Sequence, residues 1–407
     1  MPPLLFYLTY AEQPSGVYSG QVNDVVRFIK ESIGARIRLI AFISIRDFQN
    51  NRRKLKTELP DSIVLPMLPK AGYWKFNTII LALICLIFRA HGVIARNVIA
   101  ANMALTLKRK GIIRKCTFDG RGAIAAEWHE YDVRVIPSWK NQVREMEKKA
   151  VLNSDFRIAV SHRLVDYWKE WYGYQGNQHV VIPCTLDSKM SKSISGADKG
   201  MSRQRIRALH GFNEYDIILA YAGSTAGWQS FGLLEKILEP YLLKSPSNKV
   251  LFLSKQEPNI DKLMSRFGGQ VSRSWVAHET VTELLSVCDM GILIREKSTT
   301  NRVAAPTKFA EYLASGLKII ISENLGDYSD FVLQENCGMV AGNEPMQTIE
   351  PSNEADRLRM KSLMNKYFTK EAHLDAYRSL IASMSGVGNM TPVSVWGDPL
   401  NKKQPQL

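Results

Sequence analysis

The sequence contains no hydrophobic run long enough to cross a membrane as a helix. Its longest apolar run, Ile79–Phe88, has ten residues, whereas a membrane-spanning helix needs about 20. The amino-terminal stretch MPPLLFYLTYAEQ has no basic lead and no apolar core followed by a cleavage site, so we expect a first buried strand there and not a signal peptide. The five cysteines are scattered, odd in number and form no CxxC or Cys/His ligand spacing, which makes a reducing cytoplasm the simplest location.

Acidic residues are absent from one long stretch of the chain. Between Ser62 and Phe118 there is no Asp or Glu, but there are nine Lys and Arg residues. A basic region around an apolar helix is typical of a peripheral membrane surface, because each Lys or Arg near anionic headgroups contributes about 1 kcal/mol to binding. The alternative is a buried core or interdomain helix with solvated flanks. Over the whole chain 53 Lys and Arg outnumber 39 Asp and Glu, which predicts an anionic partner such as a nucleotide, a phospholipid or a nucleic acid.

The length and composition predict two folded domains. A chain of 407 residues is too long for one ordinary core and suits two domains of roughly 150–200 residues each. Short β-branched apolar runs alternate with helix-sized segments, a pattern typical of a parallel sheet with crossover helices. The first series of runs lies at 4–10, 36–44, 92–95, 156–160 and 179–183, and the second at 217–223, 249–254, 290–294 and 317–322.

A segment rich in Ser, Lys and Gly, 186–205, separates the two series and has the composition of a surface linker. We therefore expect two parallel α/β domains, over 1–195 and 205–370, that face each other across a cleft. A helix over 371–384 is expected to pack back on the N-terminal domain, and the tail over 385–407 to be poorly ordered. Parallel sheets bind ligands at the carboxyl ends of their strands, so we expect the functional site there.

Glycine-containing loops follow the first predicted strand of each domain. Gly16 and Gly20 lie in the first loop, and Gly223, Ser224 and Thr225 lie in the second. Glycine lets the backbone approach a ligand closely, and a following helix offers unpaired N–H groups to an anion. The first loop is neither a GxGxxG nor a Walker loop, so a simple strand–helix turn is the alternative there. In the second loop, the hydroxyl residues could instead cap a helix.

The most informative segment is 288–322, where a strand is expected to end at Ile294 and release Arg295 into a loop. Pro306 suits the first position of the next helix, and Lys308 and Glu311 then lie together on one face of it. This arrangement suits a nucleoside diphosphate, with cations on the phosphates and Glu311 accepting from sugar hydroxyls. The alternative is an ordinary surface pair at i, i+3.

The segment PTKFAEYLASGLKIIIS resembles the nucleotide-binding motif of glycosyltransferase family 4, particularly bacterial polysaccharide members with a P-T-K-x-x-E-Y-L-A-x-G core. Other pieces agree in order, and the resemblance spans most of 1–385; these pieces are FDGRG, AVSHRLVDYW, YAGSTAGWQ, CDMGILIRE and GDYSDFV. The resemblance implies a GT-B architecture of two Rossmann-like, doubly wound domains, with the acceptor mainly on the first and the sugar nucleotide mainly on the second. It also implies a retaining transferase that moves a sugar from a UDP- or GDP-sugar to a lipid-linked or glycan acceptor in bacterial surface polysaccharide synthesis. The basic, acid-free stretch 62–118 leads us to expect this activity at the inner face of the cell membrane.

On the donor side, the resemblance assigns Glu311 to the second carboxylate of a paired-Glu motif, which binds the nucleotide ribose. Val303 stands where the first carboxylate is expected. The usual Arg and Lys after the first strand of the second domain are also absent, which leaves Arg295 and Lys308 as the phosphate cations. Pro306, Thr307 and the helix end would complete that site.

On the acceptor side, Arg96 stands at the strand end where many family members carry a histidine, and Asp119 and Glu127 follow along the chain. We expect Arg96, Asp119 or Glu127 to orient the acceptor hydroxyl or the donor sugar. The alternative is that Asp119 and Arg121 form a satisfied ion pair at a strand end.

The sequence has no DxD pattern in a suitable loop. We therefore expect neither a metal nor another cofactor, with the nucleotide sugar acting as a co-substrate. Fixed cations and N–H dipoles would stabilise the leaving diphosphate. A non-catalytic sugar-nucleotide or glycan binding protein is the main rival, suggested by Val303, whereas nucleic-acid binding lacks a recognisable module.

Overall fold

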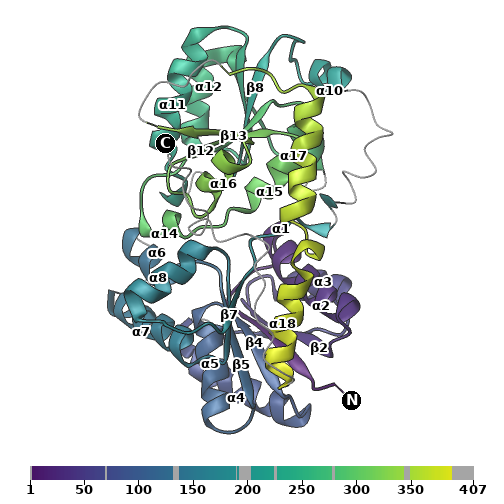
Figure 1. Ribbon diagram of the computed structural model, residues 1–407, viewed down its shortest axis with the longest axis vertical. Helices are drawn as coiled ribbons and strands as arrows, with labels where there is room; N and C mark the ends of the chain where they lie inside the picture. Colours follow the sequence, from purple (N-terminus) through teal and green to yellow (C-terminus); the bar gives the residue numbers. More distant parts are fainter. Residues whose placement is uncertain are drawn as a thin grey trace, which may run out of the picture. The chain divides into compact units, whose positions relative to one another are not determined.

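The computed structural model describes residues 2–68, 71–131, 137–188, 190–191, 203–223, 227–276, 280–342 and 349–386. The chain divides into two compact units, one formed by Met1–Asp187 with the described residues from Lys370 onward, and the other by Ser188–Thr369. Most of the predicted linker 186–205 and nearly all of the predicted tail 385–407 lie outside the described residues. Each unit contains one parallel sheet with helices on its faces (Figure 1).

The first unit has a seven-stranded parallel sheet in the order β3-β2-β1-β4-β5-β6-β7. Its central strand, β1, pairs with β2 on one side and with β4 on the other, so the strand order reverses at this point. The strands are β1 Leu5–Tyr10, β2 Ile37–Ile43, β3 Ile63–Pro66, β4 Gly92–Arg96, β5 Lys115–Gly120, β6 Phe156–Ala159 and β7 His179–Val181.

Helices cover both faces of this sheet. On one face α2, α3 and α18 share a core with alternate residues of β1 and β2, and α18, yellow in Figure 1, contacts β5, β6 and β7. On the other face α4 packs on α5, which packs on α7. The helices are α1 Gly16–Tyr18, the π-helical turn Ser19–Asn23, α2 Asp24–Ser32, α3 Phe48–Glu58, α4 Trp74–Ile87, α5 Val98–Arg109, α6 Ile124–Glu130, α7 Pro137–Asn153, α8 His162–Tyr172 and α18 Leu374–Ser385.

The second unit has a six-stranded parallel sheet in the order β10-β9-β8-β11-β12-β13. Here the order reverses between β8 and β11. The strands are β8 Ile217–Ala222, β9 Asn248–Leu253, β10 Val271–Ser274, β11 Met290–Leu293, β12 Lys318–Ser322 and β13 Gly338–Ala341; the helices are α10 Arg203–Leu209, α11 Phe231–Lys244, α12 Pro258–Phe267, α13 Val281–Ser286, α14 Thr299–Arg302, α15 Thr307–Ala314, α16 Tyr328–Gln334 and α17 Glu354–Tyr367.

Asp289, fully buried just before β11, fixes the amino-terminal end of the second sheet. Its carboxylate accepts from the backbone N–H of Ile218 at 2.9 Å and pairs with Arg203 at 2.8 Å. Arg207 and Arg357 lie 3.7 and 3.4 Å from the same carboxylate. This buried network lies at the amino-terminal ends of the strands and stabilises the fold. The carboxyl ends, where ligands of parallel sheets bind, lie at the opposite edge of the sheet.

The predicted fold class, two Rossmann-like parallel α/β domains, is confirmed by these sheets. Each predicted strand is present, whereas β3, β5, β10 and β13 were not predicted as strands. Among the described residues no helix combines the length and the hydropathy needed to cross a bilayer.

Candidate functional site

In the second unit, the predicted nucleotide-binding residues follow β8 and β11, the two strands between which the order reverses. Gly223 comes directly after β8, and Arg295 comes two residues after β11. Where the strand order of a parallel sheet reverses, a crevice forms at the carboxyl ends of the two neighbouring strands, and ligands bind there. Ser224 and Thr225, the other predicted residues of the β8 loop, lie outside the described residues.

Tyr312 attaches α15 to this edge of the sheet. Its fully buried hydroxyl accepts a hydrogen bond from the backbone N–H of Ala222 at 2.9 Å, at the last residue of β8. Its ring lies so close to β11 that a Cβ on Gly291 would be 2.2 Å from it. Burial raises the pKa of Tyr312, so the phenol stays neutral. The glycine of β11 and the tyrosine of α15 therefore let the helix pack closely on the sheet.

Lys308 and Glu311 form an ion pair in the first turns of α15. The lysine Nζ lies 2.6 Å from the carboxylate Oε2, and the lysine and glutamate side chains are 27% and 8% exposed. The predicted i, i+3 pair is thus present, but it is largely buried and not a loose surface pair. Pro306 immediately precedes the helix and Thr307 is its first residue, one position later than predicted for the start. The N–H groups of this first turn lie next to the pair, and that of Phe309 donates to the backbone oxygen of Pro306 at 3.1 Å.

Arg295 lies in a tightly bonded turn after β11. Its backbone N–H donates to the Ser322 hydroxyl at 3.0 Å, and its guanidinium Nη1 lies 3.5 Å from the side-chain oxygen of Asn301. Asn301 is buried and donates to the backbone oxygen of Glu296 at 3.1 Å. Burial raises the pKa of Tyr221, at the end of β8, to about 12, and the charge of Arg295 opposes that rise. Arg295 therefore acts electrostatically on the β8 edge.

Val303 is fully buried after α14. The next turn packs tightly on this segment, because Gly326, with φ +54°, approaches the carbonyl of Ala304 so closely that a Cβ would be 2.1 Å from the oxygen. The position at which the family pattern has a carboxylate is thus an apolar packing position here.

In the first unit, charged residues meet at the carboxyl ends of β1, β4 and β5. Asp119 is fully buried, and its carboxylate pairs with Arg121 at 2.8 Å, lies 3.8 Å from Arg96 and accepts from the hydroxyl of Tyr7. Arg96 in turn pairs with Glu12 at 2.9 Å. Burial and the Asp119 charge raise the pKa of Tyr7, which keeps it a neutral donor. The ion pair between Asp119 and Arg121, given above as the alternative to a functional role, is present, and Asp119 also lies beside Arg96.

Glu12 is the part of this cluster that sequence reasoning missed. Its side chain is 27% exposed, whereas that of Arg96 is 8% exposed. Asn97, with φ +71°, donates to the Glu12 carboxylate at 3.2 Å and accepts from the first N–H groups of α5. Glu12 follows β1 by two residues, so the sequence could place it at the carboxyl edge of the sheet, but it could not show that β1 and β4 are neighbours.

Glu127 lies apart from this cluster in α6. It is half-buried, and burial raises its pKa. Among the contacts of the described residues, none joins it to Arg96 or Asp119. A second acid missed from the sequence, Glu147 of α7, caps α6 by accepting from the N–H groups of Ile124 and Ala125 at 3.2 and 2.9 Å. Burial raises the pKa of Glu147 to about 7.

The two predicted glycines after β1 differ in their surroundings. Gly16 begins α1 and is exposed. Gly20 is buried, and a Cβ there would lie 3.2 Å from the side chain of Asp187. The neighbouring Gln21 donates to the backbone oxygen of Thr185 at 2.6 Å, and Lys370 donates to that of Leu186 at 3.0 Å. Gly20 therefore lies where the chain leaves and re-enters the first unit.

No group of three or more His, Cys, Asp or Glu in the described part of the chain is placed to hold a metal ion. The expectation that the reaction needs no metal and no further cofactor stays a prediction.

No family model and no curated protein matches the chain. Solved structures match nearly its whole length. A glycosyltransferase from Rickettsia africae ESF-5 has a TM-score of 0.66 at 13% identity, covering 94% of this chain and 98% of that one. Anabaena Alr3699/HepE in complex with UDP and glucose has a TM-score of 0.58 at 11% identity, covering 94% and 95%.

A third match is the UDP-GlcNAc 2-epimerase from Neisseria meningitidis bound to UDP-GlcNAc, with a TM-score of 0.51 at 10% identity, covering 95% of both chains. At these identities the matches show the fold, which is that of GT-B glycosyltransferases with two Rossmann-like domains. Because an epimerase shares it, the reaction must be argued from the site residues.

Proposed function

We propose that the protein is a retaining glycosyltransferase that moves a sugar from a UDP- or GDP-sugar to a lipid-linked or glycan acceptor. The observation that carries this proposal is the Lys308–Glu311 pair in the first turns of α15, beside the sheet edge where β8 and β11 end. A cation, a carboxylate and a helix amino terminus at such an edge match a nucleoside diphosphate. The UDP and UDP-GlcNAc bound to proteins of the same fold support this ligand class.

On the donor side, each residue has a chemical task. Arg295, Lys308 and the N–H groups after Pro306 and Thr307 would hold the diphosphate, and Glu311 would accept hydrogen bonds from the ribose. Negative charge grows on the diphosphate as the sugar–oxygen bond breaks, and fixed cations and dipoles stabilise it without reorganisation. The proposal needs no metal for this step. Gly223 would line the opposite side of the nucleotide, and the contact expected of Ser224 and Thr225 stays a prediction.

On the acceptor side, we assign contact with the reacting sugars to Glu12, whose side chain is 27% exposed, and to Arg96, which pairs with it. Arg121 is 13% exposed and pairs with Asp119 instead. Asp119 is fully buried and acts as a positioning residue, because its carboxylate neutralises and orients Arg96. Glu127 would act from α6, and its raised pKa suits a carboxyl that shares a proton with an acceptor hydroxyl. Gly16 and Gly20 lie in the helical segment that follows β1, in α1 and in the π-helical turn Ser19–Asn23.

The proposed place of action is the inner face of the bacterial cell membrane, in surface polysaccharide assembly. It is supported by α4, whose outward side chains are apolar: Phe76, Ile79, Ile80, Leu83, Leu86 and Ile87 are all exposed. We call these six residues the α4 face. The side of α4 that faces the protein instead carries Asn77, which donates to the hydroxyl of Tyr10 at 2.9 Å. An apolar face turned outward from an acid-free, basic segment suits an anionic bilayer surface.

Donor turnover by the purified protein tests the proposal. UDP- and GDP-sugars are incubated with the wild type and with Lys308→Ala and Glu311→Ala, and the released nucleoside diphosphate is measured. Each variant should lower donor affinity by about tenfold to a hundredfold, as expected for a charge-assisted hydrogen bond. Lys318→Ala is the matched control, because Lys318 pairs with Asp356 at 2.7 Å and is 25% exposed, but at the amino-terminal end of β12. It should bind donor like the wild type.

The buried Val303 favours a second candidate, a protein that binds the nucleotide sugar without turning it over. In that case Lys308→Ala and Glu311→Ala would still weaken donor binding, whereas no variant and no acceptor would raise nucleotide release above the rate in buffer. Unchanged donor binding in both variants would overturn both candidates.

A further inference from the structure

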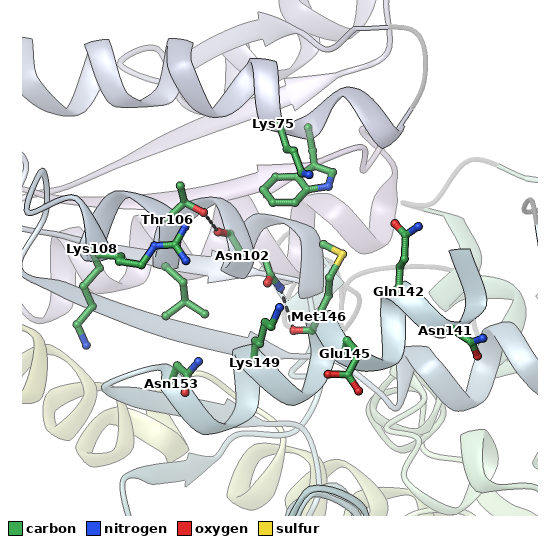
Figure 2. A pocket seen from close by; sticks show the side chains of 13 residues that line it. Lys75, Asn102, Thr106, Lys108, Asn141, Gln142, Glu145, Met146, Lys149 and Asn153 are labelled. Carbon is green, nitrogen blue, oxygen red and sulfur yellow. Dashed lines mark hydrogen bonds between the residues drawn. The ribbon is translucent and has the colours of Figure 1, made fainter. Parts of the chain in front are cut away.

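A pocket of about 720 Å³ lies in the first unit, between α4, α5 and α7 (Figure 2). All three helices cover the same face of the sheet, and the pocket lies beyond the first turn of α5, away from the Arg96–Asp119 cluster. Asn102 of α5 forms part of its wall and donates to the backbone oxygen of Met146 at 2.9 Å, which ties α5 to α7. The two sides of the pocket are therefore held at a fixed separation.

Four cations and one carboxylate line this pocket; the cations are Lys75, Lys108, Arg109 and Lys149, and the carboxylate is Glu145. The Nζ of Lys108 forms an ion pair with the carboxylate of Asp155 at 2.8 Å. Arg109 and Lys149 are exposed and form no ion pair with any carboxylate of the described residues. Figure 2 shows Lys75 on α4 and Lys149 on α7, on either side of α5. The pocket thus carries an excess of uncompensated positive charge.

The rest of the lining is partly apolar, with Trp74, Leu105 and Met146 contributing from the three helices. Trp74 and Lys75 begin α4, the helix whose next residue, Phe76, starts the α4 face. A site for free phosphate alone would not need an apolar wall or an apolar outer face beside it. Cations in a partly apolar pocket next to such a face match a phosphate that is attached to an acyl chain.

We infer that this pocket binds the phosphate headgroup of an anionic phospholipid while the α4 face rests on the bilayer. Arg109 and Lys149 pair with the phosphate, Lys75 reaches it from α4, and Trp74 and Leu105 contact the glycerol and first methylenes. The inference rests on the membrane association proposed above and is independent of sugar transfer.

Vesicle flotation with the full chain tests this inference. Three compositions are compared: phosphatidylcholine alone, phosphatidylcholine with phosphatidylglycerol, and phosphatidylcholine with enough oleate to give the same surface charge without a further phosphate. The wild type should bind the phosphatidylglycerol vesicles at least about tenfold more than the neutral ones, and severalfold more than the oleate vesicles. Equal binding to the two anionic compositions would overturn the headgroup pocket and leave a diffuse charge effect.

Charge-reversal variants locate the effect. Arg109→Glu with Lys149→Glu should remove the preference for phosphatidylglycerol over oleate. Lys110→Glu with Arg114→Glu makes the same charge change in the acid-free segment outside the pocket lining, and should lower binding to both anionic vesicles equally. Arg52→Glu with Lys54→Glu, exposed on α3 at the opposite face of the sheet, should bind like the wild type. A pocket variant that keeps the preference would refute the site.

Two further measurements distinguish the lipid headgroup from other ligands of the pocket. Inorganic phosphate that bound the protein in solution as tightly as phosphatidylglycerol vesicles do, at matched ionic strength, would show a site for free phosphate and contradict the lipid. Ile79→Gln with Leu83→Gln should lower binding to every vesicle, since it removes the apolar contact. If the wild type floats with no vesicle, both the pocket inference and the membrane association fail, whereas the donor assay above is unaffected, so the two failures are distinguishable.

Discussion

The hydroxyl of Tyr312 accepts a hydrogen bond from the backbone N–H of Ala222 at 2.9 Å, and this bond joins the helix of the nucleotide motif to the end of β8. Both groups are buried. The position of Lys308 and Glu311 relative to the β8 loop therefore depends on a residue that touches no ligand.

Tyr312→Phe should destabilise the second unit and weaken donor binding together. The change leaves the Ala222 N–H without its acceptor, which costs about 1–3 kcal/mol in a buried position. Thermal unfolding and donor titration measure the two effects. Tyr215→Phe, at an 83% exposed position, is the control and should change neither. A Tyr312→Phe protein with wild-type unfolding and donor affinity would contradict the role of this bond.

Gly291→Ala should be one of the more damaging small changes in the chain. The added Cβ would lie 2.2 Å from the Tyr312 ring, so α15 or β11 must shift, at a cost of about 1–3 kcal/mol or more. The matched control is Gly232→Ala in α11, where a Cβ meets nothing within 4 Å. That change should be neutral or stabilise by about 0.5–1 kcal/mol, because alanine is the better helix residue. Equal unfolding temperatures in the two variants would argue against the close packing.

Glu147 should make the first unit less stable as the pH rises from about 4.5 to about 7. Burial raises its folded-state pKa from 4.5 to about 7, so between these values the folded protein binds more protons than the unfolded chain. Its contribution is therefore complete below about pH 4.5 and is lost by about pH 7, with a size of about 3 kcal/mol. Glu147→Gln should flatten this part of the curve of unfolding temperature against pH. A variant curve parallel to the wild type would disprove the assignment.

Glu12→Gln should lower sugar transfer without changing donor affinity. The carboxylate pairs with Arg96 at 2.9 Å at the edge of the first sheet, so its neutralisation alters the acceptor side only. Arg96 is only 8% exposed, so the loss of its Glu12 partner should also lower the unfolding temperature, because a buried charge is then less well compensated. Glu31→Gln, exposed on α2, is the control. A fall in donor affinity equal to the fall in transfer would show that Glu12 acts on the donor, which contradicts its assignment to the acceptor.

The sequence predicted those strands whose apolar runs are long and β-branched, and it did not predict the shorter or more polar ones. β10 reads VSRS and β3 ends in Pro66, so neither has an apolar alternation that periodicity can detect. β5 reads KCTFDG, and its burial depends on neighbours on both sides. Parallel pairing partners, and not local pattern, make these segments strands.

The site residues divide in the same way. Lys308 and Glu311 are three positions apart on one helix, so their pairing could be predicted from helical spacing alone. The pairing of Arg96 with Glu12 joins residues 84 positions apart, and Glu147 reaches α6 from a different helix. The first contact follows from which strands are neighbours and the second from which helices pack together, and the sequence alone specifies neither. For the same reason, the sequence did not predict that Asn77 of α4 faces the protein and bonds to Tyr10.

The position of a bound nucleoside diphosphate tests the proposed donor site most directly, and a crystal structure of the protein with UDP or GDP measures this position. We expect the diphosphate oxygens within hydrogen-bond distance of Lys308, Arg295 and the first N–H groups of α15, with the ribose hydroxyls on Glu311. A nucleotide bound elsewhere, with Lys308 and Glu311 still paired only to each other, would contradict the account.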